Sequence, residues 1–207
     1  MEFMITKDNL KDIINQLNNN QVICFKTDTI WGLSANPNSS KAIQKLYTIK
    51  HRNLDKPFIF LISKNQNLND LVESVSATEQ KLIDNFWPGP LTIIFKAKKD
   101  LSLLKNYREN KTIALRMPDD EICQNLLQNI DYPLPSTSVN IEGQPSLNDS
   151  EKIIETFTDE DIYLLTKTTQ NNTNNVSSTI VICEGNNVNI LREGSISKTD
   201  ILKCLNS

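Results

Sequence analysis

Three cationic side chains lie within the short segment KHRNLDKP, residues 50–57. Lys50, Arg52 and Lys56 follow a helix-like run and precede an apolar run that begins at Pro57. Arginine and lysine bind phosphate oxygens without a glycine-rich loop. Because ligands commonly bind at the edge of an α/β sheet, this placement predicts a phosphate site. The alternative is that the cations only stabilise the C-terminus of a helix.

A cluster of hydroxyls follows the apolar run QVICF, in the segment KTDTIWGLSAN at residues 26–36. Thr27 and Thr29 can offer hydroxyls to a small polar substrate, Trp31 an apolar wall, and Gly32 room for close approach of the main chain. Pockets for small molecules combine such polar groups with apolar walls. The alternative is a strand-end turn whose hydroxyls are already bonded, with Trp31 in the core.

Further polar groups follow predicted strands later in the chain. STSVN at residues 136–140, extended to Ser146, offers hydroxyls and an amide for phosphate or carboxylate oxygens, although an ordinary Ser/Thr turn has the same composition. Arg116 in ALRMP and Arg192 in ILREG each end a predicted strand. An arginine at such a position is often only solvated, so neither residue identifies a site alone.

Several kinds of chemistry are disfavoured by what the sequence lacks. Its five glycines have neither P-loop nor GxGxxG spacing. His51 is the single histidine, so a multi-histidine metal site is excluded, and no metal ligands are assigned. A Ser-His-Asp triad would need His51, where two flanking cations disfavour its protonated form. The four cysteines form no CxxC pair and are expected to be reduced, with three in apolar runs.

The bulk properties favour one globular domain over residues 1–207. The formal net charge of −3 disfavours a protein that coats nucleic acid. No basic-then-apolar leader and no run of about 18 apolar residues is present, which predicts a cytoplasmic protein without membrane spans.

The elements that position these residues follow from apolar periodicity. Helices are predicted around 10–17, 40–49, 77–86, 121–130, 148–157 and 201–205. Strands are predicted at 21–25, 57–63, 91–97, 112–117, 178–183 and 187–193, the last two as a hairpin. The asparagine-rich stretch 166–175 is expected to be a long loop. This mixture predicts an α/β domain with a mixed, twisted sheet flanked by helices.

Taken in order, the motifs resemble the YrdC/TsaC family over roughly residues 8–196. They are KTDTIWGLSAN, KHRNLDKP, FWPGPLT, ALRMP, STSVN with GQPS, SSTIV and ILREG. The resemblance implies a YrdC-like fold with a large, concave, positively charged cavity. It also implies that the protein is a nucleotidyltransferase, specifically a threonylcarbamoyl-AMP synthase. Such an enzyme forms L-threonylcarbamoyladenylate and pyrophosphate from L-threonine, bicarbonate and ATP, with Mg²⁺, for tRNA t6A modification. The product would pass to the tRNA threonylcarbamoyl-transfer machinery, and weak tRNA binding is left open.

The resemblance also implies roles for individual residues. Lys50 and Arg52 would be catalytic and would contact the ATP phosphates. The implied L-threonine contacts are Thr29, Arg116, Ser136 and Ser178. The implied ATP contacts are Lys50, Arg52, Lys56, Thr112, Ser138, Asn140, Ser146 and Arg192.

The sequence departs from the family pattern at four positions. Lys26 and Ser177 stand where proline is usual, Trp31 where tyrosine is frequent, and Val139 where alanine is usual. Three other functions stay open: a YciO-type paralogue, a carbamoyl-phosphate enzyme like the YrdC-like part of hydrogenase maturation factors, and a non-catalytic RNA-binding module on the same fold.

Overall fold

The computed structural model describes residues 2–4, 9–51, 57–99, 101, 103, 111–158, 160, 162–166 and 175–206. Its helices are α1 (Leu10–Asn18), α2 (Ser40–Ile49), η1 (Leu68–Asp70), α3 (Ala77–Phe86), α4 (Glu121–Gln128), α5 (Ser150–Thr156) and α6 (Lys198–Asn206). Its strands are β1 (Glu2–Met4), β2 (Val22–Lys26), β3 (Trp31–Ser34), β4 (Ile59–Leu61), β5 (Leu91–Lys96), β6 (Thr112–Arg116), β7 (Leu134–Ser138), β8 (Ile162–Thr166), β9 (Thr179–Glu184) and β10 (Asn187–Arg192).

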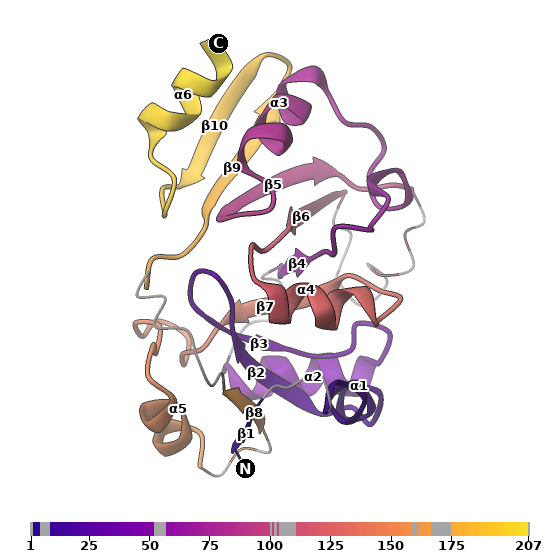
Figure 1. Cartoon of the computed structure of the whole chain (residues 1–207), viewed down its shortest axis with the longest axis vertical. Coiled ribbons are helices and arrows are strands. Elements are labelled where there is room, and N and C mark those ends of the chain that lie inside the picture. Colours follow the sequence, from indigo (N-terminus) through magenta and orange to yellow (C-terminus); the bar gives the residue numbers. More distant parts are fainter. Residues whose placement is uncertain are drawn as a thin grey trace.

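The strands of the described chain form one mixed sheet in the order β1-β8-β2-β3-β7-β4-β6-β5-β9-β10. The pairs β1–β8, β2–β8, β4–β6 and β5–β9 are parallel. The remaining pairs are antiparallel. Figure 1 shows this sheet from β1 near the bottom to the β9–β10 hairpin and α6 at the top. The predicted α/β class with a mixed sheet is confirmed.

Helices cover both faces of the sheet. On one face, α1 and α4 pack on inward side chains of the central strands, including Phe25, Leu61 and Leu134. The larger cluster on the other face includes α2. Figure 1 shows α1 and α4 in front of the sheet and α2 behind it. Because strand side chains alternate between the faces, β2 contributes Val22 and Cys24 to the larger cluster and Ile23 and Phe25 to the smaller one.

Side-chain caps explain where most helices begin. Ser39 caps α2, Asp120 caps α4 and Asp149 caps α5, each by accepting a hydrogen bond from a backbone N–H of the first turn. Ser76 forms a capping box with Glu79 at the start of α3. Asn9 occupies the N-cap position of α1 without a side-chain cap, and Thr6, a residue type that favours N-cap positions, lies outside the described residues.

Four strands are absent from the ranges predicted from the sequence: β1, β3, β7 and β8. The segment of β3 reads as a turn because it mixes an aromatic, a glycine and polar residues, yet it pairs with β2 on one side and β7 on the other. The last helix forms where predicted and extends from Lys198 to Asn206. Ile201 and Cys204 form its buried side, whereas Leu202 is 47% exposed, because positions three apart share a helix face.

The cysteines are free, and Cys24, Cys123 and Cys204 are buried as expected. Burial raises the pKa of the Cys24 thiol, which keeps it protonated. No helix in the described part of the chain combines the length and hydrophobicity that crossing a bilayer requires. The asparagine-rich stretch 167–174 lies outside the described residues.

Candidate functional site

The tip of the β2–β3 hairpin is closed by its own threonines. Thr27 donates from its backbone N–H to the carbonyl of Ile30 at 3.2 Å and from Oγ1 to the same carbonyl at 2.9 Å. Thr29 donates its backbone N–H to Thr27 Oγ1 at 3.2 Å. Both threonines are buried, at 5% and 1% exposure. Thr27 therefore stabilises the turn that presents Thr29.

The Thr29 hydroxyl has a defined hydrogen-bond direction. Because Thr27 Oγ1 gives its single proton to Ile30, Thr29 must be the donor in the 3.0 Å contact between the two hydroxyls. Thr29 Oγ1 in turn accepts from Arg116 Nη1 at 2.7 Å. One lone pair of Thr29 is left to accept a further hydrogen bond. The hydroxyls of this turn are hydrogen-bonded as the turn interpretation expects, whereas their contact with a substrate stays a prediction.

Arg116 ends β6 and is held on three sides. Its Nη2 donates to Asp28 Oδ1 at 2.5 Å, and its Nε donates to the carbonyl of Gly89 at 3.1 Å. Gly89 belongs to the WPGP turn after α3 and donates its own N–H to the carbonyl of Met117 at 2.8 Å. With the bond to Thr29, three of the five guanidinium N–H groups have acceptors among the residues that the structure describes.

Lys50 lies at the C-cap of α2 and is 3% exposed. Its ammonium donates to the carbonyl of Ser138 and to Asn140 Oδ1, each at 2.6 Å. Ser138 Oγ also donates to Asn140 Oδ1 at 2.7 Å. The Asn140 amide group then donates to the carbonyls of Ile141 and Gln144. A buried cation is thus joined to the turn that follows β7.

Arg192 is the last residue of β10 and lies next to a β-bulge. Its side chain contacts Ser178, the residue before β9. Its Nε and Nη2 donate to the carbonyl of Ser178 at 3.1 and 2.9 Å. Ser178 Oγ lies 2.8 Å from Thr92 Oγ1. Loss of water lowers the pKa of Arg192, and the nearby positive charge of Arg116 lowers it further. An anion near the two guanidinium groups would offset their repulsion, so this part of the structure favours anion binding.

These groups line one cavity of about 330 Å³. Its polar lining includes Thr27, Thr29, Lys50, Arg116, Ser136, Thr137, Ser138, Asn140, Glu142, Ser177, Ser178 and Arg192. Its apolar lining includes Ile30, Trp31, Pro57, Ile59, Leu61 and Ile180. Figure 1 shows the tip of the β2–β3 hairpin extending past β7 toward the segment that enters β9. The cavity therefore joins residues from distant parts of the sequence.

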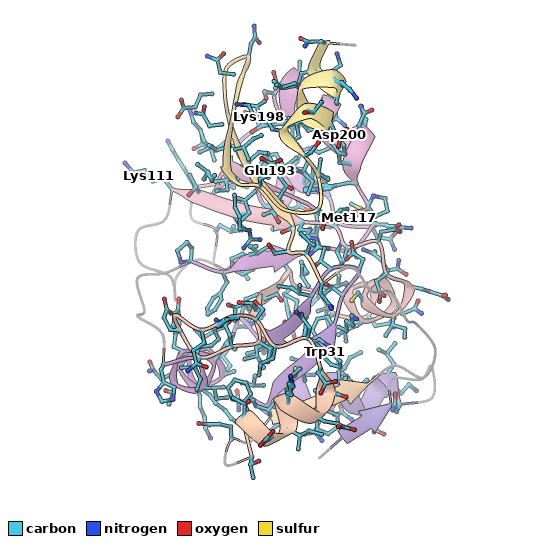
Figure 2. The ribbon with its side chains drawn as sticks, turned by 90° about the vertical axis from the view of Figure 1, so that its left-hand side faces the viewer. Trp31, Lys111, Met117, Glu193, Lys198 and Asp200 are labelled. Atoms are coloured by element: carbon cyan, nitrogen blue, oxygen red, sulfur yellow. The ribbon has the colours of Figure 1, made fainter. Side chains whose placement is uncertain are left out.

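Two residues of β3 shape this cavity. Gly32 leaves room for the Ser136 hydroxyl, since a Cβ there would lie 2.6 Å from Ser136 Oγ. Trp31 lines the cavity and is also 6% exposed within the larger core cluster, so it serves as both wall and core residue. Figure 2 labels Trp31 in the lower half of the molecule and Met117, which follows Arg116, above it.

The structure brings most of the predicted site residues together. Eight of them line the cavity: Thr29, Lys50, Arg116, Ser136, Ser138, Asn140, Ser178 and Arg192. Thr112 does not; it lies at the exposed start of β6, on the same face as Arg116 and about 13 Å along the strand. Ser146 also lies outside the lining, in the loop that returns to Val139 through the N–H of Leu147. Arg52 and Lys56 lie outside the described residues.

Two acidic residues of the site had no assigned role in the sequence. Asp28 stands between the two threonines of the hairpin tip, and its pairing with Arg116 joins positions far apart in the chain. Glu142 lines the cavity, and its backbone N–H donates to the carbonyl of Lys50. That these carboxylates lie beside a ligand-sized cavity is recognisable only after folding. The predicted positive charge of the cavity stays a prediction, although its lining includes Lys50, Arg116 and Arg192.

The arrangement suits a small zwitterion beside a polyanion. Hydroxyls and guanidinium groups from the hairpin tip, β6 and β10 can bind a carboxylate or a phosphate. Apolar side chains complete the walls. Within the described ranges, no group of three or more His, Cys, Asp or Glu side chains could hold a metal ion.

Comparison with known proteins identifies the family to which this chain belongs. The model of the Sua5/YciO/YrdC family, described as telomere recombination, matches residues 15–194. The threonylcarbamoyl-AMP synthase of Bacillus subtilis is 32% identical over 186 residues. That alignment covers 89% of this chain but 53% of the B. subtilis protein, so the chain spans about half the length of this relative.

Two solved structures share the fold. P. abyssi Sua5 complexed with L-threonine has a TM-score of 0.85 at 24% identity, covering 99% of this chain and 59% of that chain. E. coli YciO has a TM-score of 0.83 at 20% identity, covering 97% and 98% of the two chains. The family match spans the hairpin tip, the lysine-bearing end of α2, the turn after β7 and both arginines of the cavity. The chain belongs to the Sua5/YciO/YrdC family.

Proposed function

We propose that the chain is a threonylcarbamoyl-AMP synthase that uses L-threonine, bicarbonate and ATP. The observation that carries this proposal is the cavity itself. It places Thr29, bonded to Arg116, in the same 330 Å³ space as Lys50 and the turn after β7. Relatives at about 30% identity that carry this activity support the assignment.

L-Threonine would bind at the hairpin tip. The two Arg116 N–H groups that have no partner among the described residues suit the substrate carboxylate. Thr29 can accept a hydrogen bond from the substrate nitrogen through its remaining lone pair. Ser136 and Ser178 lie on the same lining and would complete the polar contacts.

ATP would bind at the other polar groups of the cavity. Lys50, Ser138, Asn140 and Arg192 would face the phosphates. The contacts predicted for Arg52, Lys56, Thr112 and Ser146 would extend this site. Because opposite charges about 4 Å apart interact by about 4 kcal/mol at an effective dielectric constant near 20, several cations are needed to hold a triphosphate beside a carbamate.

The reaction needs positioning more than a strong general base. The threonine amine takes up CO₂ as a carbamate, and a carbamate oxygen attacks the α-phosphorus while the bond to pyrophosphate breaks. The cavity would hold the two anions in line and offset their repulsion. Apolar residues such as Ile59, Leu61 and Ile180 would limit water, which would otherwise hydrolyse the adenylate.

Mg²⁺ fits this site as an ion carried by the nucleotide. Glu142 is the carboxylate among the cavity-lining residues, and Mg²⁺ typically binds one or two carboxylates together with substrate phosphates. When bound, the ion would neutralise phosphate charge. The product would pass to the tRNA threonylcarbamoyl-transfer machinery in the cytoplasm.

Pyrophosphate release tests the proposal. Purified protein is incubated with ATP, Mg²⁺ and bicarbonate, with and without L-threonine, and the product is identified by mass. Release that depends on both threonine and bicarbonate, with the mass of threonylcarbamoyl-adenylate, is the expected result. Lys50→Met should be inactive, whereas Lys198→Met, on α6, serves as a matched control. Absence of this product with the wild-type protein would refute the proposal.

A second function is favoured by one observation. The likeness to E. coli YciO extends over nearly the whole of both chains. A YciO-type paralogue would keep a nucleotide site and take a different small substrate. Thermal protection by ATP without threonine-dependent turnover would favour this function. An RNA-binding module is opposed by the net charge of −3.

A further inference from the structure

The carboxylate of Asp28 contacts Arg116 from outside the cavity. The two side chains are 8% and 6% exposed, and Asp28 Oδ1 lies 2.5 Å from Arg116 Nη2. Arg116 and Thr29 line the cavity, whereas Asp28 is absent from its lining. Asp28 can therefore act on a bound ligand only through its charge and through its contact with Arg116.

The guanidinium of Arg116 is oriented by three acceptors from two separate turns. Asp28 and Thr29 come from the hairpin tip, and the Gly89 carbonyl comes from the WPGP turn. A guanidinium is planar, with its N–H groups in a fixed fork, so these contacts fix the directions of the two remaining N–H groups. Asp28 supplies the one full negative charge among the three acceptors.

Asp28 also offsets one of two neighbouring positive charges. The charge of Arg116 is strong enough at Arg192 to lower the pKa of that arginine. A carboxylate at 2.5 Å from Arg116 reduces this repulsion and keeps the guanidinium at the hairpin tip.

We propose that Asp28 is a positioning residue that aims Arg116 at the carboxylate of L-threonine. This inference rests on the proposed function. It adds Asp28 to the threonine site as a residue that acts without contacting the substrate.

Neutralising Asp28 should have opposite effects on a ligand held mainly by charge and on a ligand held by directed hydrogen bonds. The local potential becomes more positive, which favours any anion held mainly by charge, such as ATP. The guanidinium also loses its strongest acceptor, which disfavours a ligand held by directed hydrogen bonds, such as the threonine carboxylate. General disruption of the fold would instead weaken the binding of both ligands.

Isothermal titration calorimetry with L-threonine and, separately, with ATP and Mg²⁺ tests the inference. Asp28→Asn should bind L-threonine at least tenfold more weakly and ATP equally or up to about threefold more tightly. Asp28→Glu keeps the charge on a longer side chain and should recover part of the threonine affinity. Asp12→Asn, an exposed change on α1, should match the wild type. Wild-type threonine affinity in Asp28→Asn, or equal loss of both ligands, overturns the inference.

Asp28→Asn leaves Arg116 buried without its carboxylate partner, and the variant would then fold poorly if this cost is large. A double variant keeps the test decisive in that case. Asp28→Asn combined with Arg116→Gln removes both charges. If Asp28 acts through Arg116, the double variant and Arg116→Gln should bind L-threonine with equal affinity. A further loss in the double variant overturns the inference. A wild-type protein that binds no L-threonine overturns the proposed function and this inference together, whereas normal wild-type binding with unaffected variants overturns the inference alone.

Discussion

Arg116 and Arg192 reach the same cavity from β6 and β10, two strands that are separated in the sheet by β5 and β9. The positive charge of Arg116 adds to desolvation in lowering the pKa of Arg192. Two guanidinium groups placed in this way favour an anion, and each has a different set of supports. Arg116 has a carboxylate partner, whereas the contacts of Arg192 in the described chain are to Ser178.

Arg192→Met should therefore weaken nucleotide binding. Hydrogen bonds to charged groups contribute about 1.5–3 kcal/mol each, so ATP affinity should fall by roughly 10- to 100-fold. Titration calorimetry with ATP measures this effect. L-Threonine affinity should change less, and a larger loss of threonine than of ATP would contradict the assignment of Arg192 to the nucleotide.

Lys50→Met should reduce both stability and turnover. The variant removes the ammonium donor from the Ser138 carbonyl and from Asn140 Oδ1, which keeps its bond from Ser138 Oγ, and each lost hydrogen bond to a charged group costs about 1.5–3 kcal/mol. Urea unfolding gives the stability change, and pyrophosphate release gives the activity. Unchanged stability would show that the ammonium does not support the turn after β7.

Gly32→Ala should alter the cavity more than the fold. The new Cβ would lie 2.6 Å from Ser136 Oγ, and a serine side chain can rotate away from it. We expect weaker L-threonine binding with a stability loss of about 1 kcal/mol. Adding Ser136→Ala removes the clash and should recover the stability, though not the affinity, because the serine hydroxyl is then absent. Equal affinity in all three proteins would place Ser136 outside the substrate site.

Tyr132→Phe should stabilise the protein or leave its stability unchanged. The Tyr132 hydroxyl is buried without a hydrogen-bond partner among the described residues, and removing such a group recovers up to about 1–3 kcal/mol. Thermal unfolding at neutral pH measures this change. A loss of stability would reveal a partner for the hydroxyl.

The same variant should change the pH dependence of stability. Burial, and secondarily the charge of Asp131, raises the pKa of Tyr132 to about 12 from about 10. The native state therefore keeps a proton that the unfolded state loses, so stability decreases as pH rises from about 10 to 12. Urea unfolding across this range should show a shallower decrease for Tyr132→Phe. Parallel curves for the two proteins would contradict the prediction.

The sequence predicts elements well where the signal is local. In α2, α3, α4 and α5 the apolar spacing lies within the helix and the capping residue directly precedes it, and these helices form where expected. The β9–β10 hairpin is local in the same sense. β3 was missed because its strand character depends on two neighbouring strands, one of them distant in sequence.

The site was predictable as a set of residue types but not as a set of contacts. Motifs indicated Thr29 and Arg116 separately, and their hydrogen bond joins positions 87 apart in the sequence. The role of Asp28 depends on that same long-range pairing, so no local pattern could reveal it. Thr112 and Ser146 were assigned by motif alone, and their ATP contacts stay predictions.

The position of β8 has a consequence for the order of folding. β8 lies between β1 and β2 and pairs in parallel with both, so the first two strands of the chain join one sheet only after Thr166 has been synthesised. A nascent chain shorter than this exposes an open edge of β2, which is a template for unwanted strand pairing. Arg192 emerges later still, so the complete cavity can form only after β10 has been synthesised. Such long-range pairing also predicts slow folding compared with a helical protein of equal size.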